Sequence, residues 1–240
     1  MTEQERIDIL VLAKSFFRKK IVINHIKNTK KLSKLSTFSL NPFLSNYLAN
    51  YLTGNSSAES IAKALIYPRV LGTSITTTFG THMQYFCSSV LSGFASTTSG
   101  IDIEFIDQVE NRRKYCQIKS GPQTINKDDV ETIKRHFSAV KNLARTNHLD
   151  INYSDLIVGI FYGTPQNLSG NYKLVGVEYP VYIGKEFWYR LTGDLDFYYH
   201  LINAIGEIAI ETDATLLLDK IIAELAHEIE NSQELRGATL

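Results

Sequence analysis

The chain has few of the features that mark secreted, membrane or disulfide-bonded proteins. Its 240 residues include only two cysteines, Cys87 and Cys116, without CxxC or Cys/His spacing, which argues against a disulfide framework or a zinc site. No apolar run approaches the roughly 20 residues that cross a bilayer, and the polar residues 1–8 are unlike a signal peptide. We therefore expect a soluble, cytoplasmic protein without membrane association, in which both cysteines are buried thiols.

Acidic residues are missing from one long stretch of the chain, because none occurs in residues 9–58. This stretch carries eight basic residues, whereas residues 194–234 carry ten acidic residues and one lysine. The net charge of zero therefore conceals two ends of opposite sign. Exposed charges act over about 10 Å at ~0.1 M salt, so the basic stretch predicts either a phosphate-binding face or a solvated lysine-rich segment.

Several catalytic signatures are also missing. The six histidines form neither HExxH nor an H-N-H arrangement, and no GxxxxGK[ST] occurs. We expect His82, His136, His148, His200 and His227 to be ordinary surface or core residues. Any activity of this chain should therefore proceed without ATP.

Hydrophobic periodicity predicts helices at both ends of the chain and strands in the middle. The order strand, helix, strand over residues 114–162 predicts a right-handed crossover between parallel strands. The expected class is α/β, with a mixed central sheet flanked by helices and with helical N- and C-terminal regions. We predict helices at residues 7–17, 43–52, 61–71, 79–94, 125–144, 187–191, 196–209 and 214–230, strands at 101–106, 114–120, 156–162, 172–177 and 181–183, and a loop at 27–39.

Two neighbouring segments in the middle of the chain alternate polar and apolar residues. Asp102 and Glu104 lie on one face of the strand 101–106, and Gln117 and Lys119 share a face of the strand 114–120. The apolar residues between them point to the core. This pattern predicts an antiparallel hairpin with a concentration of polar groups on one side.

The register of this hairpin decides which polar groups meet. If the loop turns symmetrically between positions 110 and 111, Asp102 lies opposite Lys119 and Glu104 lies opposite Gln117. Cross-strand neighbours on one face are about 5 Å apart, so all four side chains would converge. The alternative is a solvent-facing strand pair with ordinary charge complementarity.

Ser99-Gly100-Ile101-Asp102 followed by Gln117-Ile118-Lys119 resembles the PD-(D/E)xK nuclease motif, in a QxK variant. The longer segments 100–105, 115–122 and 124–129, with 68–74 upstream and 184–188 downstream, resemble a type II restriction endonuclease subfamily that cuts short GC-rich palindromes. The resemblance implies a restriction-endonuclease-like fold and a single nuclease domain over residues 1–240. Within it we expect a basic helical N-terminal region at 1–58, a catalytic core at 59–191 and a helical C-terminal region at 192–240.

The same resemblance implies a site for Mg²⁺, for which Mn²⁺ can substitute. Asp102, the Gln117 side chain and the Ile118 backbone carbonyl would be its ligands, and Lys119 would contact the attacking water and the phosphate. Gln117 is a departure, because a neutral amide stands where the family motif has a carboxylate, and the site is left short of negative charge. Glu104 on the same face and Glu59 on a preceding helix are the two candidates to restore it.

Six residues are candidates for DNA contact. Asn126 and Lys127 begin a helix, where free backbone N–H groups suit a phosphate, although the same pattern describes a plain helix cap. The hydroxyl-rich segment after Arg69 suits either DNA contact or a turn with a cap. The candidates are Arg69, Thr73, Ser74, Asn126, Lys127 and Tyr162.

Taken with its motifs, the chain is expected to be a type II restriction endonuclease that cuts double-stranded DNA as a homodimer, with a cognate DNA methyltransferase as its genetic partner. Two alternatives are a repair or junction nuclease of the same fold, and a catalytically degenerate DNA-binding module. The apolar faces of the C-terminal helices, including Leu216, Leu217, Ile221, Ile222 and Leu225, suit either core packing or a dimer surface.

Overall fold

The computed structural model describes residues 1–90 and 94–232 and divides into two compact units. Unit 1 comprises Met1–Phe16 and Gly80–Glu207, and unit 2 comprises Phe17–Phe79 and Ile208–Leu240. Each unit is therefore built from separate stretches of chain. Cys116 is a buried thiol, as predicted, whereas the Cys87 side chain lies outside the described part of the structure.

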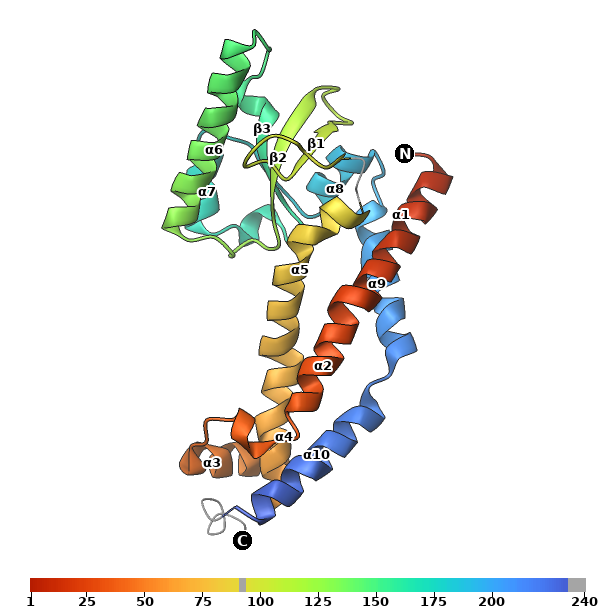
Figure 1. Cartoon of the computed structure of the whole chain (residues 1–240), viewed down its shortest axis with the longest axis vertical. Helices are drawn as coiled ribbons and strands as arrows, with labels where there is room; N and C mark the ends of the chain where they lie inside the picture. The colour runs from red at the N-terminus through yellow and green to blue at the C-terminus, as the bar shows by residue number, and fades with distance from the viewer. Residues whose placement is uncertain (91–93, 233–240) are drawn as a thin grey trace. The chain divides into compact units, whose positions relative to one another are not determined.

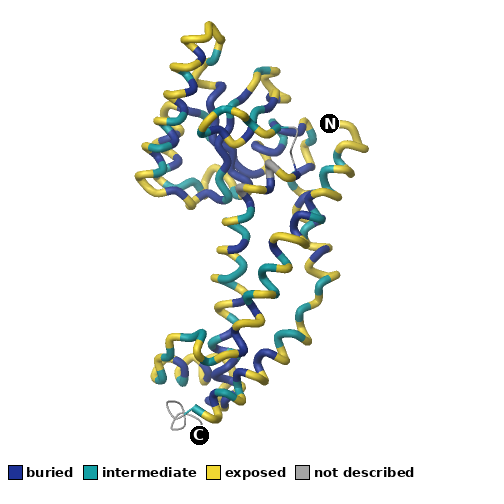
Figure 2. The backbone as a smooth tube through the Cα atoms, in the orientation of Figure 1, coloured by how far each residue is buried: buried dark blue, intermediate teal, exposed yellow. Residues whose placement is uncertain are grey.

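A four-stranded mixed sheet forms the buried centre of unit 1 (Figures 1 and 2). Its order is β1 (Ile103–Ile106), β2 (Arg113–Lys119), β3 (Leu156–Ile160) and β4 (Val181–Ile183). The β1/β2 pair is antiparallel, and the two other pairs are parallel. Helix α6 (Lys127–Thr146) connects the parallel strands β2 and β3. The predicted α/β class is confirmed, and so is the predicted helical connection between two parallel strands.

Alternate residues of β3 pack against opposite layers, which explains why this strand is apolar throughout. Leu156, Val158 and Ile160 belong to the same cluster as the buried side chains of α6. On the other face, a Cβ added at Gly159 would lie 2.3 Å from the Phe187 ring of α8 (Lys185–Thr192), so the helix touches the strand backbone there. The sheet is thus covered on both faces, and side chains of β2 must point into one layer or the other.

The helices outside this layered centre account for most of the remaining chain. In unit 2, α4 (Ala58–Pro68) and α10 (Thr215–Glu230) pack together through side chains such as Ile61 and Leu225. No helix in the described ranges has the length and apolarity to cross a membrane. Helices α5 (Ile75–Val90) and α9 (Phe197–Thr212) have residues in both units. Unit 1 also contains α1 (Glu3–Phe16), η5 (Tyr153–Asp155), η6 (Pro165–Asn167) and α7 (Gly170–Gly176). Unit 2 contains η1 (Phe17–Val22), α2 (Ile23–Lys31), η2 (Leu35–Thr37), α3 (Pro42–Thr53), α4 (Ala58–Pro68), η3 (Arg69–Ser74) and α10 (Thr215–Glu230).

Three predictions about secondary structure are wrong. The predicted strand 172–177 is helix α7, whose buried residues Tyr172 and Val175 have helical spacing. The predicted loop 27–39 is helical as far as Lys31, where α2 ends. The helix expected from residue 79 begins at Ile75, and its expected end crosses residues 91–93, which lie outside the described ranges.

The predicted hairpin register is also wrong. The structure pairs Glu104 with Tyr115 rather than with Gln117. The reason lies in the loop: Asp107 N–H donates to the Arg112 carbonyl at 2.9 Å, and Asn111 adopts a left-handed backbone with a φ of 53°. These contacts close the loop earlier than the predicted symmetric turn would. The register of β1 on β2 therefore differs from the predicted one, and Glu104 lies opposite Tyr115.

A network of ion pairs holds this loop against the sheet. Lys114 is fully buried and donates to Glu110 at 2.6 Å and to the Ser154 carbonyl at 2.9 Å. Arg112 donates two hydrogen bonds to the buried Asp155 carboxylate, at 2.9 and 2.5 Å. Arg190 of α8 joins the network from the other side, because it bonds both Asp107 and Glu110 at 2.9 Å. Buried charges are tolerated here because each has a partner.

Candidate active site

A pocket of about 250 Å³ opens beside the sheet in unit 1, between the end of β2 and α6. Three segments of the chain form its wall. Its lining residues are Gly100, Ile101 and Asp102 before β1, Gln117, Ile118 and Lys119 on β2, and Asp129, Thr132, Ile133 and His136 on α6. The structure therefore brings together all three motif positions, Asp102, Gln117 and Lys119.

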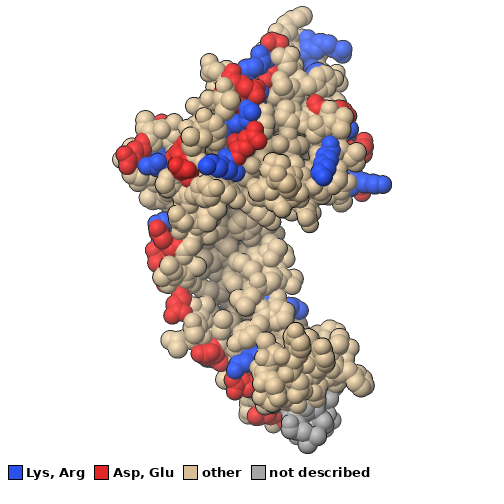
Figure 3. All heavy atoms as spheres, turned by 180° about the vertical axis from the view of Figure 1, so that it is seen from behind, with Lys and Arg blue, Asp and Glu red and all other residues tan. Residues whose placement is uncertain are grey.

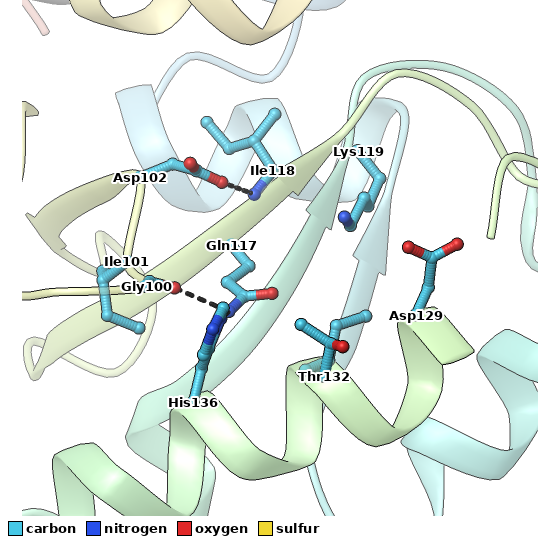
Figure 4. Close-up of a pocket in the computed structure, with 10 residues that line it drawn as sticks. Gly100, Ile101, Asp102, Gln117, Ile118, Lys119, Asp129, Thr132 and His136 are labelled. Atoms are coloured by element: carbon cyan, nitrogen blue, oxygen red, sulfur yellow. Dashed lines mark hydrogen bonds between the residues drawn. The ribbon is translucent and has the colours of Figure 1, made fainter. Parts of the chain in front are cut away.

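Strand alternation places two of these side chains on the α6 side of the sheet. Gln117 and Lys119 pair with Val158 and Ile160 of β3, which face α6. In Figure 4, the Gln117 side-chain oxygen, the Lys119 ammonium group and the Asp129 carboxylate face a common space. The predicted shared face of Gln117 and Lys119 is therefore confirmed.

Gln117 is held firmly although it is polar and almost fully buried, with an exposed fraction of 5%. Its Nε2 donates to the Gly100 carbonyl at 2.6 Å and to Nδ1 of His136 at 2.8 Å. Both N–H groups are used, so the amide oxygen is the atom that is available toward the pocket.

Asp102 approaches β2 from the segment before β1. Its Oδ2 accepts a hydrogen bond of 2.6 Å from the Ile118 backbone N–H. Desolvation raises the pKa of the Asp102 carboxyl, and the Ile118 N–H, Lys119 and His136 only partly oppose that rise. A cation in the pocket would favour the ionised carboxylate, because an opposite charge offsets the cost of burial. The backbone N–H and C=O of one strand residue point to the same edge, so the Ile118 carbonyl faces this side as well.

Asp129 is a charged pocket residue that the motif did not indicate. It occupies the first turn of α6, where its Oδ2 accepts from the Asn126 N–H at 2.8 Å in a reciprocal cap. Thr132 and His136 follow at helical spacing and line the same pocket. The spacing was visible in the sequence, but its significance depended on which face of α6 meets β2. The expectation that His136 is an ordinary residue missed its contact with Gln117.

Glu104 and Glu59, the two acids predicted to restore the missing negative charge, do not line this pocket. Glu104 accepts from Ser96 Oγ at 2.6 Å and Thr98 Oγ1 at 2.9 Å, and pairs with Arg113 at 3.2 Å. Desolvation raises the pKa of Glu104, but these contacts outweigh it and leave the pKa below its ordinary value. Glu59 lies in unit 2, largely exposed, and pairs with Lys63 at 2.5 Å.

Three DNA-contact candidates share a polar pocket of about 470 Å³ in unit 2. Arg69, Thr73 and Ser74 line it, together with Lys31 and Asn28. The Oγ atom of Ser74 is buried and has no hydrogen-bond partner among the described residues. Residues 69–74 form a π-helical turn, η3, and not the turn with a cap that was the alternative to DNA contact. Such turns are frequent at functional sites.

The three remaining candidates lie in unit 1. Asn126 is the N-cap of α6 and accepts from the Asp129 N–H at 2.9 Å, which confirms the predicted cap. Lys127 is exposed beside it. Tyr162 is 44% exposed just after β3, and its hydroxyl lies so close to Gly121 that a Cβ there would be 2.5 Å away. These positions leave the helix start and Tyr162 accessible to a ligand.

A family model described as type II restriction endonuclease EcoO109I matches residues 12–213. The matched region includes the hairpin, α6 and both pockets. No curated protein matches the chain.

Proposed function

Because the chain belongs to the EcoO109I family of type II restriction endonucleases, which are site-specific deoxyribonucleases, we propose that it hydrolyses double-stranded DNA with Mg²⁺ as a homodimer. The observation that carries this proposal is the convergence of Lys119, Asp129 and the Gln117 oxygen on one space beside Asp102. Phosphodiester hydrolysis needs a group that offsets developing negative charge and oxygen ligands for a hard cation. The pocket offers both.

The donor set of the pocket fits Mg²⁺ as an oxygen site. No group of three or more His, Cys, Asp or Glu side chains among the described residues is arranged to hold a metal ion. However, Mg²⁺ binds through few protein oxygens and keeps several waters. Asp102, the Gln117 amide oxygen and the Ile118 carbonyl would hold it, Asp129 would add negative charge, and Mn²⁺ would be accepted by the same oxygens. Such a cation lowers the pKa of water and polarises a phosphate.

Lys119 is the residue proposed to act on the phosphate itself. Its ammonium group lies in the common space shown in Figure 4, and no ion pair with a described residue engages it. It can donate hydrogen bonds to a phosphate oxygen and to the attacking water, which offsets the charge that develops in the transition state. Asp102 and Gln117 would hold the cation beside this phosphate.

The first prediction concerns the source of negative charge. Asp129→Asn should raise the Mg²⁺ concentration for half-maximal cleavage by about 10- to 100-fold, the usual cost of losing a supporting group at a metal site. The reason is that Asp129 is the only carboxylate besides Asp102 among the residues that line the pocket in the described structure. Asparagine keeps an oxygen that can accept from the Asn126 N–H, so the helix cap survives. Cleavage across a Mg²⁺ titration provides the measurement.

Glu104→Gln and Glu59→Gln are the matched controls for Asp129→Asn, and both should stay close to the wild-type Mg²⁺ requirement. Glu104 is engaged by Ser96, Thr98 and Arg113, and Glu59 is engaged by Lys63. If either control raises the Mg²⁺ requirement more than Asp129→Asn does, the acid replaced in that control, and not Asp129, supplies the negative charge.

The proposed DNA contacts come from both units. In unit 2, Arg69 and Lys31 supply positive charge, and Thr73 and Ser74 supply hydroxyl donors, in a pocket whose described lining contains no acid. In unit 1, the start of α6 at Asn126 and Lys127 suits a phosphate, and Tyr162 lies beyond β3. Part of the basic stretch has another use, since Lys34 pairs with Glu228 at 2.9 Å. These contacts would position the backbone rather than read bases.

The proposed homodimer follows from one active site per chain and two DNA strands to cut. A surface on α3 suits the second copy, because this helix has no charged residue and exposes Phe43 (88%), Tyr47 (61%) and Tyr51 (80%). Figure 3 shows the region of α3 as a surface without Lys, Arg, Asp or Glu. The C-terminal helix is less suitable, because Ile222 and Leu225 are buried in the core of unit 2.

The second prediction tests this surface. Tyr51→Glu should convert the dimer to a monomer in sedimentation experiments. The substitution would bury a carboxylate in the proposed apolar contact between two copies of α3, which is unfavourable. Leu216→Glu is the matched control, since Leu216 is 82% exposed on α10, outside the α3 surface. Dissociation by Leu216→Glu but not by Tyr51→Glu would place the dimer contact elsewhere.

Plasmid digestion with purified protein and Mg²⁺ tests the proposed function as a whole. Discrete fragments, blocked by methylation with a cognate DNA methyltransferase, are the expected result. Cutting that depends on DNA structure instead of sequence would indicate a repair or junction nuclease. Retardation of DNA without cutting would indicate a degenerate binding module and overturn the proposal.

A further inference from the structure

The orientation of the Gln117 amide matters in a way that the orientation of a carboxylate at the same position would not. The two ends of a carboxylate are alike, whereas an amide presents either an acceptor oxygen or a donor NH₂ group. Only the oxygen can bind a cation. A glutamine in this position therefore serves a metal site only if something fixes its orientation.

Two acceptors fix it in this structure. The Gly100 carbonyl accepts from Gln117 Nε2 at 2.6 Å, and Nδ1 of His136 accepts at 2.8 Å (Figure 4). If the amide turned over, its oxygen would face the Gly100 carbonyl oxygen and the Nδ1 lone pair without a hydrogen between them. A buried acceptor without a donor is costly, and Gln117 is only 5% exposed. The oxygen is therefore directed away from Gly100 and His136, toward the space shared with Lys119 and Asp129.

The backbone at Gly100 is shaped for this contact. Its φ of 79° is a left-handed conformation that favours glycine, and a Cβ at this position would lie 2.6 Å from Cγ and 2.8 Å from Nδ1 of His136. Glycine thus allows the chain before β1 and the imidazole of α6 to meet over the same amide. His136 lines the pocket on the same helix face as Asp129 and Thr132, two turns from Asp129 and one turn from Thr132.

We propose that His136 is a positioning residue that, with the Gly100 carbonyl, holds the Gln117 amide with its oxygen toward the proposed Mg²⁺ site. This inference rests on the proposed function, because it assigns His136 a role in the same site. His136 acts as a hydrogen-bond acceptor through Nδ1, because the Gln117 NH₂ group can only donate. It touches neither the cation nor the phosphate, and acts only through Gln117.

A pair of substitutions separates the acceptor from the bulk of the ring. His136→Leu removes the acceptor, whereas His136→Asn places an amide oxygen near the position of Nδ1. We expect His136→Leu to raise the Mg²⁺ concentration for half-maximal cleavage by about 10- to 100-fold, as for other groups that orient metal ligands. His136→Asn should stay within a few-fold of the wild type. Arg135→Leu, an exposed neighbour on α6, is the control for a general effect on the helix.

The side-chain amide signals of Gln117 in nuclear magnetic resonance spectra give a second readout that requires neither metal nor activity. Signals that are absent from Gln117→Met identify them. In the wild type and in His136→Asn, both amide protons should exchange slowly with water, because both are hydrogen-bonded. In His136→Leu, exchange should be faster.

Four outcomes decide the inference. The inference is supported if His136→Leu raises the Mg²⁺ requirement and speeds exchange of the Gln117 amide protons, while His136→Asn stays close to the wild type in both measurements. Equal impairment of the two variants overturns it, because the acceptor would then not matter. An unchanged Mg²⁺ requirement and unchanged amide exchange in His136→Leu also overturn it. If the wild-type enzyme shows no Mg²⁺ dependence, the proposed function fails and the metal role with it, while the amide exchange still reports whether His136 holds Gln117.

Discussion

Lys119→Ala should lower DNA cleavage by about 10²- to 10³-fold while DNA binding survives, a loss typical for a group that stabilises transition-state charge. Lys119 is the one lysine or arginine among the residues that line the pocket in the described structure. Its ammonium group points into the space shared with Asp129 and Gln117. Binding should survive because most of the proposed phosphate contacts lie elsewhere, at Arg69, Lys127 and their neighbours.

Cleavage of a plasmid under single-turnover conditions, together with a gel-shift titration of the same DNA, measures both effects. Lys173→Ala is the matched control, because Lys173 is an exposed lysine of α7 outside the pocket. Near wild-type cleavage by Lys119→Ala would refute the assignment. A parallel loss of cleavage and of binding would show that Lys119 serves affinity rather than the chemical step.

The largest effect on stability is expected for Asp155→Ala, with a loss of about 3–5 kcal/mol in the free energy of unfolding. The Asp155 side chain is 2% exposed and accepts two hydrogen bonds from Arg112, besides an ion pair of 3.4 Å with the buried Lys114. Without the Asp155 carboxylate, the buried Lys114 ammonium group keeps only Glu110 as an acidic partner among the described residues. Asp150→Ala is the matched control, because Asp150 pairs with Arg112 at 3.6 Å but is 83% exposed, and such exposed pairs contribute about 0–1 kcal/mol.

Urea unfolding at a series of pH values extends this test. Desolvation raises the pKa of Asp155, but Arg112, the Asn152 N–H and Lys114 outweigh it and leave the pKa below the ordinary value of 3.8. A carboxyl with a lowered pKa in the folded state contributes stability above its ordinary pKa and loses that contribution as the pH falls through the folded pKa. The difference between wild type and Asp155→Ala should therefore narrow below about pH 4. A constant difference down to pH 2 would contradict this origin.

Local sequence pattern was sufficient for some of the site and insufficient for the rest. Strand alternation alone places Gln117 and Lys119 on one face, and the structure confirms it. The partner of Glu104 depends instead on how the loop closes, and Arg190 of α8 holds that loop through Asp107. A residue so far along the chain cannot be anticipated from the hairpin sequence, so the predicted register failed.

Asp129 and His136 were missed for a related reason. Their spacing marks them as one face of α6, but helical spacing does not say whether that face meets solvent or a strand. Helix α7 shows the same limit, since the alternation at 172–177 fits a strand while the spacing of Tyr172 and Val175 fits a helix. Burial on the sheet decides between them, and burial is a property of the folded chain.

Under the proposed function, the neutral Gln117 amide also changes the charge that a phosphodiester meets in the pocket before a cation binds. The pocket side chains carry one fewer negative charge than they would with an ionised carboxylate at position 117. An approaching phosphodiester is therefore repelled less, because like charges in a partly desolvated pocket interact more strongly than they do in water. Under the proposed function, the metal-free protein should consequently tolerate DNA in this pocket, and engagement with a target would not have to wait for the metal.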